Sequence, residues 1–184
     1  MQSIKLDRHV QARVWIDENP RAIYPATEII SKNIANGLTK KNKNKNKRGS
    51  IEIIIPVGAR FFYGFLGAEF FPNDSGSFGI ELLVSTEHEN IYAESIASEF
   101  DQIRLGLPSE YSQSVLAGAI ESLAEKKLGE FGSGILRFDQ AAHSQIGSSN
   151  KFFRHIARTV VQLLMLDRSR KEEISEIVKT YSLV

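Results

Sequence analysis

The sequence predicts an α+β protein in which helices cover one face of a mostly antiparallel sheet. Three observations lead to this prediction. Three runs rich in β-branched and aromatic residues fall within residues 51–85. Two later segments, Tyr111 to Leu123 and Phe153 to Leu164, repeat their apolar residues at helical spacing. A short β-rich run, residues 134–138, lies between these two segments.

The first predicted strand begins near Ala12, where Ala12, Val14 and Ile16 share one face and the Asn-Pro pair at 19–20 closes the run. Residues 39–50 are predicted to form a mobile loop, because a tract almost without apolar residues cannot offset its ordering entropy. The tract is either a solvated linker or an arm that contacts phosphates. Its basic residues are Lys40, Lys41, Lys43, Lys45, Lys47 and Arg48.

The three β-rich runs cover residues 51–57, 61–72 and 78–85. Gly64 and Gly67 in the second run indicate a bulge or a close backbone approach. The Asn-Asp-Ser-Gly-Ser segment before the third run is a hairpin signal, so we expect the second and third strands to pair. The apolar residues within 87–103 do not follow a single period, so this region is predicted to be either strand or irregular structure.

The first helix is predicted to start at Pro108, which is tolerated in a first turn, and to end by Gly129. The second helix starts at Ser148 or Ser149, and either residue can cap it. After residue 167 the charged sequence predicts an amphipathic tail helix over 168–184. We therefore expect one domain over 1–167 and an appended helix.

The composition excludes several classes of protein. The chain has 184 residues and no cysteine, which rules out disulfides, thiolate zinc sites and cysteine nucleophiles. The N-terminus lacks an apolar signal region and nowhere do 18 apolar residues run together, so we expect a cytoplasmic protein without a membrane span. The net charge is +1, but residues 61–103 contain eight acids and no Lys or Arg.

Three collinear segments resemble the fourth domain of the elongation factor G family of translational GTPases, which includes the tetracycline-resistance ribosomal protection proteins. Residues 58–64, Gly-Ala-Arg-Phe-Phe-Tyr-Gly, are similar to the family's Gly-Gly-Arg-Gly-Gln-Tyr-Gly loop. Residues 107–111, Leu-Pro-Ser-Glu-Tyr, resemble its Ile-Pro-x-Glu-Tyr helix start. His143, followed by Ser148-Ser149, resembles its His and Ser-Ser segment, and residues 20–28 give a weaker fourth match.

The resemblance covers about residues 12–167 and implies a split β-α-β sandwich, like that of a related small-subunit ribosomal protein domain. In the family, the arginine loop and the histidine loop lie together at the domain tip and enter the ribosomal decoding site. Here Phe61 and Phe62 replace the family's Gly-Gln pair, and one extra residue follows His143. No phosphate loop of the Gly-x-x-x-x-Gly-Lys-Ser/Thr type is present, so we expect no GTPase activity.

The resulting hypothesis is a non-catalytic module, without cofactor or metal, that binds the ribosome or another structured RNA. Aromatic residues beside a cation suit loop or single-stranded RNA. The candidate RNA contacts outside the basic tract are Arg60, Phe61, Phe62, Tyr63, His143 and Gln145. The candidate loop-shaping residues are Gly58, Gly64, Gly147, Ser148 and Ser149.

Two other functions remain open at the level of sequence. The acidic segment 61–103 could bind a basic protein partner, with the tail helix pairing two copies. Asp139, His143 and Ser148 supply the residue types of a hydrolytic triad, although nearness in sequence says little about geometry.

Overall fold

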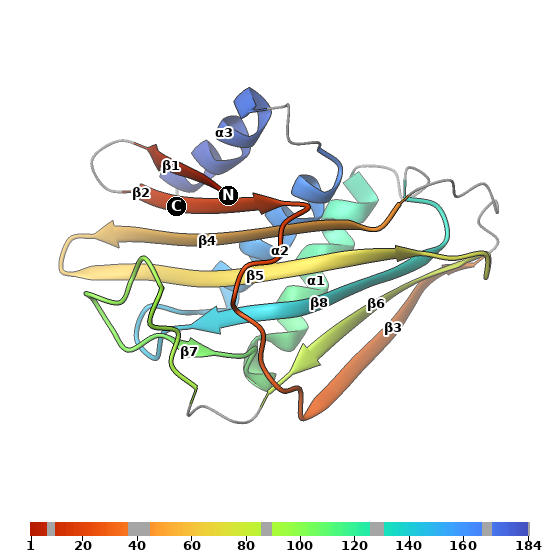
Figure 1. The fold of residues 1–184 in the computed structure, drawn as a ribbon, viewed down its shortest axis with the longest axis horizontal. Helices are drawn as coiled ribbons and strands as arrows, with labels where there is room; N and C mark the ends of the chain where they lie inside the picture. Colours follow the sequence, from red (N-terminus) through yellow and green to blue (C-terminus); the bar gives the residue numbers. More distant parts are fainter. Residues whose placement is uncertain (7–9, 37–44, 86–89, 126–130, 167–170, 184) are drawn as a thin grey trace.

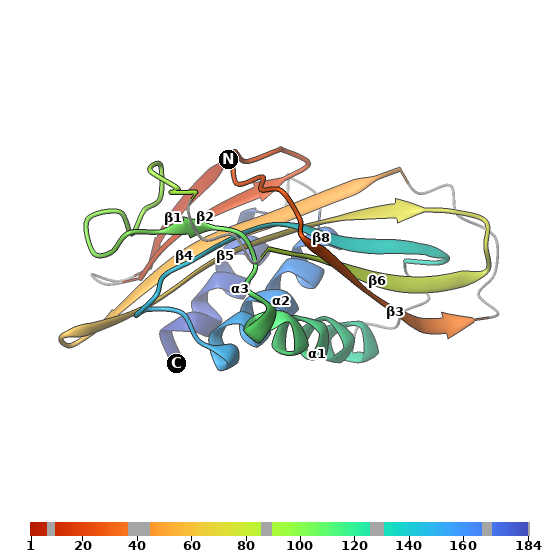
Figure 2. The same cartoon turned by 90° about the horizontal axis from the view of Figure 1, so that it is seen from below.

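The chain forms an α+β sandwich, as predicted, with an eight-stranded, mostly antiparallel sheet and helices on one face (Figures 1 and 2). The structure is a computed structural model, and it describes residues 1–6, 10–36, 45–85, 90–125, 131–166 and 171–183. Within these ranges no helix is both long enough and apolar enough to cross a membrane.

The elements follow one another along the chain with the helices concentrated in its second half. The strands are β1 (Gln2–Leu6), β2 (Val10–Ile16), β3 (Glu28–Asn36), β4 (Lys47–Val57), β5 (Arg60–Pro72), β6 (Ser77–Val84), β7 (Arg104–Leu105) and β8 (Gly134–His143). The helices are α1 (Ser109–Glu125), α2 (Asn150–Leu164), α3 (Lys171–Lys179) and the 3-10 helix η2 (Thr180–Leu183).

The sheet has the order β1-β2-β4-β5-β8-β6-β3, and β7 pairs with the end of β8. β4 and β5 are antiparallel neighbours, but β5 and β6 do not pair. β8 lies between them, antiparallel to β5 and parallel to β6. The turn between β5 and β6 was correctly located, but the predicted hairpin was wrong. Strand β8, which is distant in sequence, lies between β5 and β6 and forms hydrogen bonds with both.

The main core lies between the sheet and helices α1 and α2 (Figure 2). Alternate residues of β4 and β5, such as Ile53 and Leu66, meet the apolar face of α2, including Phe153 and Val160. Gly64 lets α2 approach β5 closely, because a Cβ there would lie 2.4 Å from Ile156 Cδ1. The predicted close approach is confirmed, although Gly64 lies within a strand and does not shape a loop.

A second apolar cluster covers part of the opposite face of the sheet. It contains Trp15, Tyr63 and Phe65, and irregular segment 90–103 contributes Tyr92, Ala97 and Ile103. The connection from β2 to β3 crosses the same face (Figure 1), and Ile23 forms an isolated bridge with Gln140 of β8. The ambiguous 87–103 region, where described, is therefore mostly turns and bends, with only a bridge at Ile91.

Residues 47–50 correct the prediction of a mobile loop over 39–50. They are the first residues of β4, and Ser50 is fully buried. The sequence does not reveal that residues 47–50 belong to a strand, because lysines and asparagines surround them. They nevertheless pair with residues 67–70 of β5 and so belong to the sheet. Residues 37–44, with Lys40, Lys41 and Lys43, lie outside the described residues.

The tail helix α3 is amphipathic, as predicted, but it is packed against the rest of the protein. Ile174, Val178 and Tyr181 are buried in the main core. Tyr181 donates a hydrogen bond to Thr159 Oγ1 (2.9 Å) and meets Phe152 edge to face. The apolar face of α3 is therefore packed within this chain and does not support the pairing of two copies through the tail.

Candidate nucleic-acid interface

The β4–β5 turn and the loop after β8 lie side by side at one end of the sheet. The Tyr63 N–H donates to Gly147 O (2.9 Å), and Ser148 Oγ donates to Tyr63 O (2.8 Å). Gly147 is pressed against the Phe61 ring, since a Cβ there would lie 2.3 Å from it. The two segments that the family resemblance placed together are thus in contact. We call residues 57–62 and 144–149 the tip.

Short-range hydrogen bonds hold the two loops of the tip in shape. Gly58 has φ +62°, a conformation that favours glycine in two-residue hairpin turns. Ser144 Oγ donates to Asp101 and accepts from the Gly147 N–H (2.7 Å). Ser149 is the N-cap of α2, and its side chain accepts from the Phe152 N–H (3.3 Å). The roles expected for Gly58, Ser148 and Ser149 are supported, whereas sequence reasoning missed Ser144 and Asp101.

Phe61 and Phe62 project to opposite faces of β5, and each is half-buried. The Phe61 ring contacts Phe100 (centroids 5.8 Å apart) on the face under segment 90–103, and the Phe62 ring contacts Phe152 (5.7 Å) on the helix face. Arg60 and Gln145 are exposed beside them. Each face of the tip therefore offers a partly accessible aromatic ring next to polar side chains.

Tyr63 cannot be the surface contact that we expected. It is fully buried, its hydroxyl donates to Glu52 Oε1 (2.9 Å), and it accepts from Ser95 Oγ (3.0 Å). Burial raises the pKa of this hydroxyl well above its usual range. The cause is the alternation of β5, which directs Tyr63 into the second apolar cluster under segment 90–103.

His143 is also buried, with 5% of its surface exposed. β8 continues five residues beyond the predicted strand, so His143 ends a strand and pairs with Arg104 of β7. Its Nδ1 is 3.1 Å from Gly106 O, and the Tyr111 ring covers it. The expected contact of His143 with RNA is therefore not supported. His143 only borders a cavity of about 280 Å³ with Gln145 and Glu110.

The described end of the basic tract does not join the tip. Lys45 is exposed and Lys47 half-buried, but Lys47 begins β4 whereas the tip lies at the other end of that strand. Ten steps of about 3.3 Å separate the two ends by roughly 33 Å. Arg48 forms ion pairs with Glu69 and Asp139 on the sheet face opposite the helices (Asp139 at 3.1 Å) and is therefore not available to phosphates.

A groove beside the tip is lined by basic side chains that sequence reasoning missed. It has a volume of about 320 Å³ and contains the half-buried Phe62 ring. Its basic residues Lys151, Arg154, His155 and Arg158 are spaced i, i+3, i+4 and i+7 on α2, so they share one face of the helix. That spacing was readable in the sequence once the buried face of α2 was assigned. We call this surface the α2 groove.

The charges of the α2 groove are only partly compensated. Arg154 pairs with Glu121 of α1, and the hydrogen bond it donates lowers the pKa of that carboxyl. Arg158 pairs with Glu125 (2.8 Å). Burial, with Arg158 and Lys151 nearby, lowers the pKa of His155, which favours the neutral imidazole. Lys151 is exposed at the end of the groove nearest the tip.

The acids of residues 61–103 that the structure describes do not form one acidic face. Glu69 pairs with Arg48, Glu81 with Arg137 (2.8 Å) and Glu94 with Arg21 (3.2 Å), so arginines from other segments neutralise them. The segment itself is divided between two strands and the irregular 90–103 region. This arrangement gives little support to binding of a basic protein through an acidic surface.

The three residue types of a hydrolytic triad have separate partners. Asp139 pairs with Arg48, His143 Nδ1 faces Gly106 O, and Ser148 Oγ lies between Ser144 N and Tyr63 O. Because a triad requires the serine, histidine and acid to be hydrogen-bonded in series, these contacts do not support one here.

Comparisons of this chain with protein-family models, with curated proteins and with solved structures found no match. The likeness to the fourth domain of elongation factor G therefore remains an expectation based on the three collinear motifs.

Proposed function

We propose that this protein is a non-catalytic module that binds structured RNA, with ribosomal RNA the first candidate, through the tip and the α2 groove. The supporting observation is the hydrogen-bonded contact between the β4–β5 turn and the loop after β8. It gathers an exposed cation and two partly accessible aromatic rings at one end of the molecule. The resemblance to the translation factor domain led to the same tip.

The residues of this surface suit RNA chemically. Phe61 and Phe62 offer ring faces on which unpaired bases stack, and Arg60 and Lys151 offer cations for the phosphates beside them. Arg154 can exchange its carboxylate partner for a phosphate, since the ion pair with Glu121 is on the surface. Binding would place the tip by shape and hold it by phosphate contacts, without chemistry on the RNA.

Tyr63 and His143 have positioning roles in this proposal. The Tyr63 backbone bonds to Gly147 and Ser148, and its buried side chain, which donates to Glu52, fixes the position of that backbone. His143 ends β8 directly before the loop. Their replacement would disturb the loops instead of removing a contact to RNA.

A ribosome-pelleting assay tests the proposal. Wild-type protein is expected to sediment with ribosomes at low salt and to be released as salt rises. Arg60→Ala and Lys151→Ala should each weaken sedimentation several-fold, because each removes about one phosphate contact. Lys45→Ala is the matched control, since Lys45 is an exposed cation beyond the opposite end of β4.

Absence of salt-sensitive association with ribosomes or RNA would show that the proposal is wrong. A stable protein partner in a pull-down, together with a nucleic-acid-free absorbance spectrum of the purified protein, would favour the protein-binding alternative. An effect of Lys45→Ala equal to that of Arg60→Ala would indicate a diffuse charge effect instead of a defined surface.

A further inference from the structure

Strand β3 is an edge of the sheet. It is last in the strand order and pairs with β6 on one side, and no other strand in the described part of the chain pairs with its outer side (Figures 1 and 2). An edge strand presents a row of backbone N–H and C=O groups to any strand that can align with it. The other edge is the shorter strand β1, beside which α3 packs.

The side chains of β3 leave this edge open. Glu28, Ile29, Ser31 and Lys32 are exposed, and Ile29 has 59% of its surface exposed. Ile30 is half-buried and packs against the main core from the edge. The unpaired backbone groups of this edge are therefore accessible to a strand of another chain.

The sequence of β3 is complementary to itself in the antiparallel direction. If two copies meet with Ile30 opposite Ile30, then Glu28 of each faces Lys32 of the other, and Ile29 faces Ser31. Side chains opposite one another in an antiparallel pair lie on the same face, with Cβ atoms about 4.5–5.5 Å apart. This register therefore forms two ion pairs around a central isoleucine contact.

Other registers fit less well. Centring the pair on Lys32 would place the two lysines opposite each other, which is unfavourable. It would also extend over the irregularity between Asn33 and Ala35, where the pairing of β3 with β6 shifts. Centring on Ser31 would place Glu28 opposite Ile34 and leave both charges without a partner.

We propose that two copies of this protein associate through their β3 strands, antiparallel about Ile30, to form one continuous sheet. The two helix layers then lie on the same side of that sheet. Because only about five residues of each strand pair, the interface is small and the dimer is weak and concentration-dependent. The surface is separate from the tip and the α2 groove, so this proposal does not depend on RNA binding.

Sedimentation equilibrium of the full chain tests the dimer. Wild-type protein should change from monomer to dimer as its concentration rises. Lys32→Glu places like charges opposite each other twice and should weaken association on the order of tenfold. The exchanged variant Glu28→Lys with Lys32→Glu restores both ion pairs and should return the dissociation constant to within about threefold of the wild-type value.

The positions changed are exposed, so circular dichroism should show each variant folded like the wild type. Lys5→Glu, which alters the same charge on the exposed Lys5 of β1 at the opposite edge of the sheet, should leave association unchanged. A wild-type protein that stays monomeric up to about 1 mM overturns the proposal. A dimer that Lys32→Glu does not weaken, or that the exchanged variant does not recover, overturns the assigned strand and register.

Discussion

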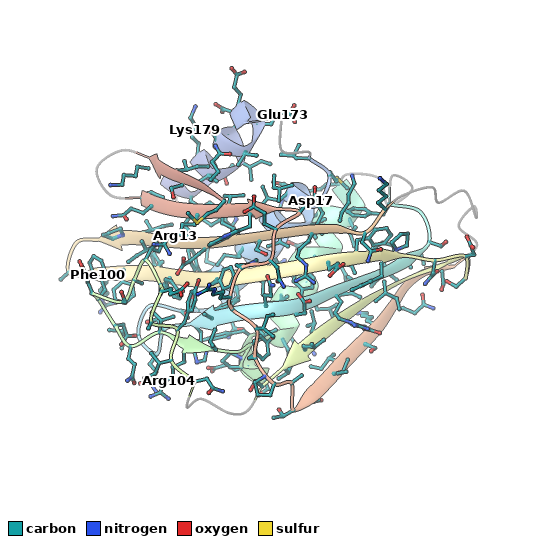
Figure 3. All side chains as sticks on the ribbon, in the orientation of Figure 1. Arg13, Asp17, Phe100, Arg104, Glu173 and Lys179 are labelled. Atoms are coloured by element: carbon teal, nitrogen blue, oxygen red, sulfur yellow. The ribbon has the colours of Figure 1, made fainter. Side chains whose placement is uncertain are left out.

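At the scale of single residues, Glu52 is an acid inside the protein. Its side chain is fully buried, and its Oε1 accepts from the Tyr63 hydroxyl (2.9 Å) and the Ile96 N–H (3.1 Å). Nη1 of Arg13 (labelled in Figure 3) lies 3.5 Å from Glu52 Oε2. Burial raises the pKa of the Glu52 carboxyl despite these partners. The group therefore links segment 90–103 to the sheet in a way that depends on pH.

Glu52→Gln should change how stability depends on pH. Because the pKa of Glu52 is raised in the folded state, its favourable contribution is fully present below the ordinary value of 4.5 and is lost as pH rises through the folded value. Glutamine cannot ionise, and its amide oxygen can keep both hydrogen bonds. The free energy of unfolding of the variant, relative to wild type, should therefore rise as pH increases from about 4.5 to about 8.

Urea denaturation at several pH values measures this difference. Glu99→Gln is the control, because Glu99 is exposed on the same segment. A constant difference between Glu52→Gln and wild type over the whole pH range would show that the carboxyl has the same pKa in the folded and unfolded states.

At the scale of elements, the contact between α1 and α2 depends on Gly118. A Cβ at this position would lie 2.1 Å from the backbone oxygen of Arg154, closer than atoms tolerate. The buried Ala157 lies at the same contact, where its Cβ would be 3.2 Å from a Cβ at position 118. The helices therefore approach closely because their facing residues are small.

Gly118→Ala should destabilise the protein, although alanine is the better helix former. The propensity gain is about 1 kcal/mol, but overpacking typically costs about 1–3 kcal/mol, and here a backbone atom must move. We expect a net loss of about 1–2 kcal/mol by thermal or urea denaturation. Gln113→Ala, on the exposed face of α1, should stay within about 0.5 kcal/mol of wild type. Equal or higher stability of Gly118→Ala would contradict the close packing.

Helix α3 is an element that belongs to the domain. Ile174 is 2% exposed in the main core, whereas Ile177 is half-buried at its margin. Ile174→Ala should lower the free energy of unfolding by about 2–5 kcal/mol, and Ile177→Ala by only about 1 kcal/mol. Both variants should unfold in one transition. Loss of α3 in a separate, earlier transition would mean that the tail folds independently.

At the scale of the whole molecule, the sequence pattern predicted the layers, and the family resemblance predicted the meeting of the tip loops. Periodicity located α1 and α2, and the Ser148-Ser149 pair located the start of α2 to within one residue, because these signals are local. The adjacency of residues 58–64 and 143–149 came from the resemblance, since no local pattern joins segments about eighty residues apart.

The remaining features depend on tertiary pairing. β8 separates β5 from β6, and no signal in the Asn-Asp-Ser-Gly-Ser turn reveals the inserted strand. β3 is an edge strand of mixed polarity, so its alternation of apolar and polar residues is weak. The start of β4 was missed because Lys47 and Arg48 continue the basic tract. His143 and Tyr63 were expected on the surface because their burial depends on Tyr111 of α1 and on segment 90–103, which cover them from elsewhere in the chain.

The salt dependence of RNA binding tests the central proposal most directly. In a filter-binding assay, the logarithm of the affinity should fall linearly with the logarithm of the salt concentration, by about 0.7–0.9 per phosphate contacted. Arg60→Ala with Lys151→Ala should reduce that slope by about two contacts relative to wild type, whereas Lys45→Ala should leave it unchanged. A slope near zero for the wild type, or the same slope for the double variant, would contradict RNA binding through the tip and the α2 groove.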